Sequence, residues 1–123
     1  MYLKNIEELS ENTNIKEKLN IIEKLMDEEN YEEAYYKLAA ILEYINIKLI
    51  RNKLNINIKD SDIVNIINIY QDKDSTLFKN MLNVNGQYNM VSELGIDEDD
   101  VIFLASIINS NYKYMLEKYG EFI

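Results

Sequence analysis

The feature that most constrains this chain is the spacing of its apolar residues, which recur every three or four positions over most of its length. One apolar stripe lies between Ile15 and Met26, a longer one between Tyr31 and about Lys53, and a third between Val101 and Tyr119. Side chains at this spacing share one face of an α-helix, and the pattern is typical of a helix that buries that face. The sequence therefore predicts an all-α fold.

Residues typical of helix ends bound these stripes. Asn14 and Asn30 are each followed three positions later by a glutamate, which is the capping-box pattern at the start of a helix. The acidic run from Asp97 to Asp100 suits the start of the last helix, because carboxylates complement the positive end of the helix dipole. Gly120 suits its end. We expect the three main helices to begin near Asn14, Tyr31 and Asp97.

The middle of the chain is less regular. Apolar and polar residues alternate over 54–60, as in a strand, but a single strand would leave its backbone groups unpaired, so we interpret this segment as an extended connection. Shorter helices are predicted over 3–9, after Ser61 or Asp62, and after Asp74 or Ser75. No linker composition interrupts the 123 residues, so we expect residues 1–123 to form a single-domain helical bundle of five to seven helices. Its expected core includes Leu19, Ile22, Leu38, Ile41, Ile45, Ile66, Phe78, Leu82, Leu104, Ile108 and Met115.

The residue types that the chain lacks exclude most catalytic chemistry. It contains no His and no Cys, so it cannot form a Ser-His or Cys-His pair or an ordinary zinc site. Its only glycines are Gly86, Gly95 and Gly120, which rules out a glycine-rich phosphate loop. We predict a protein that is not an enzyme, with no catalytic residues, no cofactor and no metal.

The charge is acidic and uneven. The formal net charge is −9, with 12 acids and 9 bases in residues 1–60 but 10 acids and 4 bases in residues 61–123. A surface of this sign repels phosphate backbones and anionic lipids, so we expect no direct nucleic-acid or membrane binding and a basic protein partner instead. No signal peptide or membrane-spanning run is recognisable, which favours the cytoplasm. The abundance of Ile, Asn and Lys resembles proteins of low-GC bacteria and their phages.

Ten tyrosines are the chief compositional oddity. Those of the two long helices are the candidate interaction residues: Tyr31, Tyr35, Tyr36, Tyr112, Tyr114 and Tyr119. Tyrosine is enriched in protein interfaces, which predicts a protein-interaction domain, with a second copy of the chain as one candidate for the partner. Tyrosines at the rim of a bundle, with the hydroxyl in water, remain the plainer alternative.

A second functional hypothesis rests on the carboxylates. An acidic inhibitor that occupies a basic nucleic-acid channel in another protein, as some phage anti-defence proteins do, needs carboxylates on one face. The candidates for such an acidic face are Asp72, Asp74, Asp97, Asp99 and Asp100. A complex of this kind dissociates as the salt concentration rises, whereas an apolar interface persists.

Two segments resemble a known family. The helix from Tyr31 to Ile45 is similar to the early helix of HEPN-type domains, and the segment from Asp97 to Tyr119 is similar to their closing helix. These domains are small helical bundles of bacterial toxin and antiviral systems and are often dimeric. In active members an Arg, usually followed by a polar residue, precedes a His by several positions, and the pair cleaves RNA. Residues 85–91 contain neither residue, and Arg51-Asn52 has no following His. The resemblance therefore implies a non-catalytic relative.

Overall fold

A computed structural model describes residues 1–53 and 94–123, and helices dominate both segments. The helices are α1 (Glu7–Glu11), α2 (Thr13–Asp27), α3 (Tyr31–Asn52) and α6 (Glu98–Tyr119). No strand occurs within these two segments. The predicted all-α class is therefore confirmed for the described part of the chain, which holds four helices.

Several predictions concern residues outside the two described segments. These are the extended connection over 54–60, the helices expected after Ser61 and Asp74, and the core positions Ile66, Phe78 and Leu82. The total of five to seven helices stays a prediction for the same reason.

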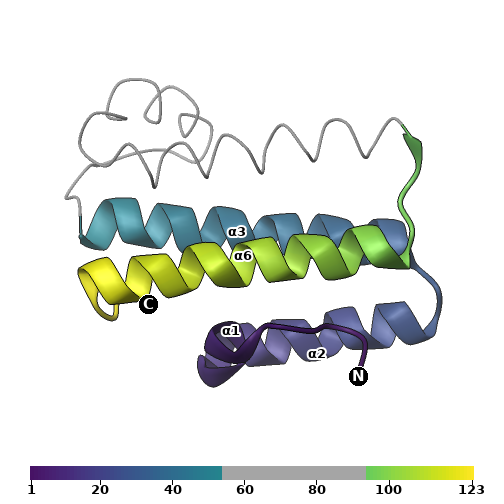
Figure 1. Cartoon of the computed structure of the whole chain (residues 1–123), viewed down its shortest axis with the longest axis horizontal. Coiled ribbons are helices and arrows are strands. Elements are labelled where there is room, and N and C mark those ends of the chain that lie inside the picture. The colour runs from purple at the N-terminus through teal and green to yellow at the C-terminus, as the bar shows by residue number, and fades with distance from the viewer. Residues whose placement is uncertain (54–93) are drawn as a thin grey trace.

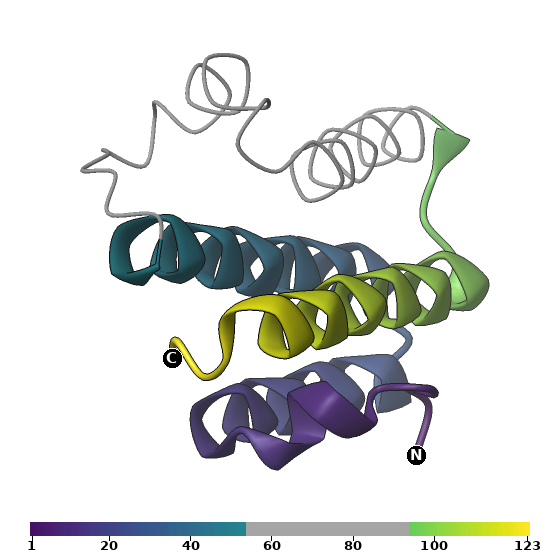
Figure 2. The same cartoon turned by 60° about the vertical axis from the view of Figure 1, so that its left-hand side comes forward.

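The long helices pack along a common direction (Figure 1). α2 runs antiparallel to α3, whereas α3 and α6 run parallel and begin at the same end of the bundle. α3 contacts both α2 and α6, and the short α1 packs against α2 and α6. Figure 2 shows the same four helices from a second side. α3 is therefore flanked by α2 and by α6, and α1 contacts these same two helices.

The predicted start of α2 was two residues late. The side chain of Asn12, not Asn14, caps the helix, with its Oδ1 accepting from the backbone N–H of Ile15 at 3.2 Å. Asn12 has an extended backbone (φ −83°, ψ 118°), which lets its side chain turn back to the free amides, while Asn14 already lies in the first helical turn.

The other two predicted helix starts lie where expected. α3 begins at Tyr31, but the side chain of Asn30 bonds the carboxylate of Glu33 at 2.9 Å and makes no cap bond to a backbone amide. At α6 the cap is complete, because Asp97 and Asp100 each accept from the backbone N–H of the other at 3.0 Å. The helix ends at Gly120, whose φ of 75° suits a residue without a Cβ.

The core is confirmed at each predicted position that the structure describes: Leu19, Ile22, Leu38, Ile41, Ile45, Leu104, Ile108 and Met115. The chain ends add to it. Leu3 and Leu9 of the N-terminal segment and Phe122 after α6 are also buried. The ring of Phe122 packs edge-on against the ring of Tyr112, with the two centroids 5.7 Å apart. The backbone carbonyl of Phe122 accepts a hydrogen bond from Asn52 Nδ2 at 2.7 Å. The residues after α6 thus close one end of the core.

Truncating this core should be costly. We expect Leu38→Ala to lower the free energy of unfolding by about 2–5 kcal/mol, because Leu38 is fully buried in the central helix and a cavity would remain. Ile21→Ala is the control, since Ile21 is exposed on α2 and its truncation should change stability by less than about 0.5 kcal/mol. Urea unfolding followed by circular dichroism measures both, and equal losses would contradict the described core.

The turn between α2 and α3 contains a strained residue. Glu29 has φ of 58°, in the left-handed region that side chains other than glycine rarely adopt. The conformation lets the backbone N–H groups of Glu29 and Asn30 reach the carbonyls of Met26 and Leu25 at 3.0 and 2.9 Å, which closes the end of α2. The sequence has no glycine here to make this turn without strain.

Glu29→Gly should therefore stabilise the protein, raising the free energy of unfolding by about 0.5–1 kcal/mol. Glu28 has φ of −85°, so Glu28→Gly should instead destabilise it. Glu29→Gln separates the loss of charge from the relief of strain. Thermal and urea unfolding of the three variants would contradict the assignment if Glu29→Gly and Glu28→Gly shifted stability in the same direction.

Candidate interaction surface

Two of the six candidate tyrosines are not on the surface, which corrects their assignment to an interaction face. Tyr35 is 2% exposed and Tyr112 is 4% exposed. Burial, the main cause, raises the pKa of the Tyr112 hydroxyl, which is hydrogen-bonded to the side chain of Asn12. Both rings belong to the core because α3 and α6 are each buried on a wider arc than one stripe covers.

The other four tyrosines lie at the surface but on different parts of it. Tyr36 is exposed, and its hydroxyl bonds the Glu32 carboxylate one turn earlier at 3.2 Å. Tyr31, Tyr114 and Tyr119 are half-buried against the core. Lys118 Nζ lies 5.8 and 5.7 Å from the ring centroids of Tyr114 and Tyr119, within cation–π range. Tyr31 lies at the start of α3, whereas Tyr114 and Tyr119 lie near the end of the parallel α6 (Figure 1). The structure brings Tyr114 and Tyr119 together beside Lys118, but it does not gather all the predicted tyrosines on one surface.

The carboxylates, by contrast, gather at one end of the bundle, where α2 ends and α3 and α6 begin (Figure 1). We call this end the acidic pole. It includes the predicted Asp97, Asp99 and Asp100, while Asp72 and Asp74 lie outside the described residues. Its members are Asp27, Glu28, Glu29, Glu32, Glu33, Asp97, Glu98, Asp99 and Asp100.

The acidic pole changes the titration of nearby tyrosines. The pKa of Tyr2 is raised, first by its hydrogen bond to Asp27 and then by the charges of Asp27 and Glu98. The pKa of Tyr31 is raised by burial and by the charges of Glu98, Glu29 and Asp97. Glu98 thus acts on both hydroxyls, and Asp27, Glu29 and Asp97 each act on one of them, so carboxylates from the end of α2 and the start of α6 lie close together.

Most of the lysines within residues 1–53 and 94–123, and the single arginine, lie toward the opposite end of the bundle, though acids accompany them. Lys18 of α2 and Lys48 of α3 both lie beside Tyr44. The Lys18 Nζ is 5.5 Å from the centroid of the Tyr44 ring, and the Lys48 Nζ is 5.7 Å from it. Arg51 and Lys53 follow at the end of α3. The described bundle is therefore polarised along its length, acidic at one end and of mixed charge at the other.

One surface feature was missed by the sequence analysis. Phe103, on α6, is 58% exposed, and Ile107 and Tyr114 on the same side are partly exposed. Together with the exposed Ser110 they lie at positions i, i+4, i+7 and i+11, which share one helix face. We call Phe103, Ile107, Ser110 and Tyr114 the α6 outer face. The signal was a second apolar stripe, out of phase with the core stripe of Val101, Leu104 and Ile108.

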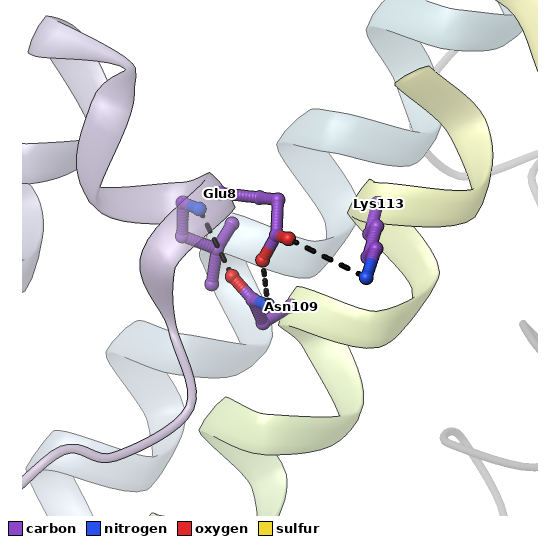
Figure 3. Close-up of polar contacts among 4 residues, drawn as sticks. Glu8, Asn109 and Lys113 are labelled. Atoms are coloured by element: carbon purple, nitrogen blue, oxygen red, sulfur yellow. Dashed lines mark hydrogen bonds and ion pairs between the residues drawn. The ribbon is translucent and has the colours of Figure 1, made fainter. Parts of the chain in front are cut away.

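A polar junction fixes the opposite side of α6 (Figure 3). The buried side chain of Asn109 accepts from the backbone N–H of Leu9 at 2.9 Å and donates through Nδ2 to the carboxylate of Glu8. That carboxylate also lies 3.9 Å from Lys113 Nζ. The hydrogen bond from Asn109, aided by Lys113, lowers the pKa of Glu8. The junction holds α1 on α6 and leaves the α6 outer face directed away from it.

Replacing the Asn109 amide by a carboxylate should reverse the pH response of this junction. In the wild type the lowered pKa of Glu8 supports stability that is lost as pH falls through that pKa, below about 4.5. In Asn109→Asp the two carboxylates repel, one pKa rises, and the deficit relative to wild type should shrink between pH 7 and pH 5. Urea unfolding at both pH values measures this deficit. A deficit that is equal at pH 7 and pH 5 would contradict the junction, and Glu7→Gln, at the exposed neighbour, is the control.

Other kinds of site find no support in the described residues. Residues 1–53 and 94–123 hold no group of three His, Cys, Asp or Glu side chains placed to bind a metal ion. None of the described helices is long and apolar enough to cross a membrane. In comparisons with known proteins, no protein-family model, no curated protein and no solved structure matches the chain.

Proposed function

We propose that the chain is a non-catalytic protein–protein interaction domain of bacterial or phage cytoplasm. In this proposal it is a degenerate HEPN-like module that folds as a single bundle of five to seven helices. The observation that carries the proposal is the α6 outer face, where Phe103 is 58% exposed one turn before the half-buried Ile107. An exposed aromatic side chain beside an apolar neighbour is the kind of residue that is enriched in protein interfaces.

The titration of the described groups supports a role without catalysis. The tyrosine pKa values that shift, those of Tyr2, Tyr31 and Tyr112, rise, and that of Glu8 falls. Each of these shifts moves the pKa further from 7, whereas a general acid or base that works near pH 7 needs a pKa shifted toward 7. The absence of His and Cys from the whole sequence points the same way.

Affinity capture with two matched variants tests the proposal. Phe103→Glu should abolish capture of the partner from the source cell, because a carboxylate would be buried in the apolar contact. Ile21→Glu, which replaces an apolar residue of similar exposure on α2, should leave capture unchanged. If both variants retain the partner, or if only Ile21→Glu loses it, the α6 outer face is not the binding surface.

The acidic pole favours a second candidate function, inhibition of a protein with a basic nucleic-acid channel. The supporting observation is that Glu98 acts on both Tyr2 and Tyr31, with Asp27 acting on Tyr2 and with Glu29 and Asp97 acting on Tyr31. A complex of this kind should form at low salt and weaken steeply as salt rises.

Charge neutralisation separates the two candidates. The triple variant Glu28→Gln, Glu32→Gln and Glu33→Gln removes exposed carboxylates of the pole without touching the Asp97–Asp100 cap or the α6 outer face. It should weaken capture of a nuclease or polymerase by about tenfold or more if the pole is the binding surface. Glu117→Gln with Glu121→Gln, at the other end of α6, is the matched control. Capture that resists both high salt and the triple variant would exclude the acidic pole.

A further inference from the structure

The α6 outer face has a geometry that fits a second copy of itself. In both Figure 1 and Figure 2, α6 lies in front of α3, and no other described helix covers its near side. Ile108 and Asn109, at the middle of the helix, point into the bundle, since both are buried. We consider a two-fold axis that is perpendicular to α6 and passes between these two residues. Because they point into the bundle, the axis emerges on the opposite side of the helix, at the middle of the α6 outer face.

Pairing across such an axis is antiparallel and joins residues that lie equally far from the midpoint. Phe103 then meets Tyr114 of the second copy, and Ile107 meets Ser110. Each contact occurs twice because the axis is a two-fold. Aromatic rings oppose each other on both sides of the axis, and the small Ser110 leaves room for Ile107 beside it. Phe103, which is exposed in the single bundle, thereby packs against an aromatic ring of the second copy.

The charge distribution favours the same antiparallel arrangement. Asp99 lies opposite Lys118 of the second copy, and the acidic pole of each bundle lies beside the mixed-charge end of the other, which carries Lys113, Lys118, Arg51 and Lys53 together with Glu117 and Glu121. A parallel pairing of the same helices would instead place the two acidic poles together, with strong repulsion. Complementarity of the poles therefore selects the direction, and the apolar centre supplies the contact.

We propose that the partner of the α6 outer face is a second copy of the chain, bound through antiparallel α6 helices around a two-fold axis near residues 108 and 109. The inference rests on the proposed function, because it names the partner of the same surface. α6 has 22 residues and spans about 33 Å, which gives two bundles a contact line as long as their main helices.

Sedimentation over a concentration series tests the partner. The wild type and Ile21→Glu should form dimers with the same dissociation constant, whereas Phe103→Glu should weaken dimerisation at least about tenfold. Circular dichroism checks that Phe103→Glu keeps the helical fold, as expected from the exposure of Phe103. A wild type that stays monomeric at every concentration overturns the second copy as partner. The capture experiment with the same two variants still decides whether the α6 outer face binds another protein.

Cross-linking tests the direction, and the natural sequence has no Cys to interfere. Asp99→Cys chains mixed with Lys118→Cys chains should be joined by a short bismaleimide, and neither variant should cross-link with itself. Asn20→Cys, at an exposed position of α2, is the control that should not cross-link. Cross-linking of Asp99→Cys with itself would overturn the antiparallel arrangement. If the chain dimerises but Phe103→Glu does not change the dissociation constant of the dimer, the α6 outer face is not the dimer interface.

Discussion

The burial of α3 is the constraint on which the rest of the structure depends. Ile45, Asn46 and Ile47 are consecutive and all buried, so the helix is covered on more than one side. A helix with two buried sides must lie at the centre of its bundle, and α2 and α6 both pack on it. The place of every other described element follows from its contact with α3 or with α6.

The parallel pairing of α3 with α6 explains much of the charge pattern. Two parallel helices bring their positive ends together, and the acidic residues at the start of each helix, among them Glu32, Glu33 and Asp97, complement those ends. The same explanation fails for α2, because Asp27, Glu28 and Glu29 lie at its negative end. A negative charge at the negative end of a helix dipole is unfavourable, so these three carboxylates do not stabilise α2. They are the part of the acidic pole that helix stability does not account for.

The sequence was sufficient for the features that depend on apolar periodicity. The stripes located α2, α3 and α6, and the acidic run from Asp97 to Asp100 marked the start of α6. The capping boxes expected at Asn14 and Asn30 did not form, because Asn12 caps α2 and the side chain of Asn30 bonds Glu33 instead of a backbone amide. Tyr35 and Tyr112 were placed wrongly because a single stripe describes one buried side, and periodicity does not show that a second helix or the chain end covers another. Phe103 was missed for the opposite reason, since an apolar residue beside a strong core stripe looks like part of it. The tertiary packing decides both cases.

The pattern of α6 is unusual for a helix whose only task is to stabilise a core. It buries Asn109 and Asn111 while it exposes Phe103. Asn109 is compensated by its bonds to Glu8 and Leu9. Asn111 Nδ2, like Asn46 Oδ1 of α3, has no hydrogen-bond partner among the residues that the structure describes, and a buried unpaired polar group costs about 1–3 kcal/mol. An apolar residue at position 111 and a polar residue at position 103 would favour stability, because the first would remove a buried unpaired amide and the second an exposed aromatic ring. An inverted arrangement of this kind is understandable when the outer side of a helix is not its final surface, because the exposed aromatic ring is then buried by binding rather than by folding.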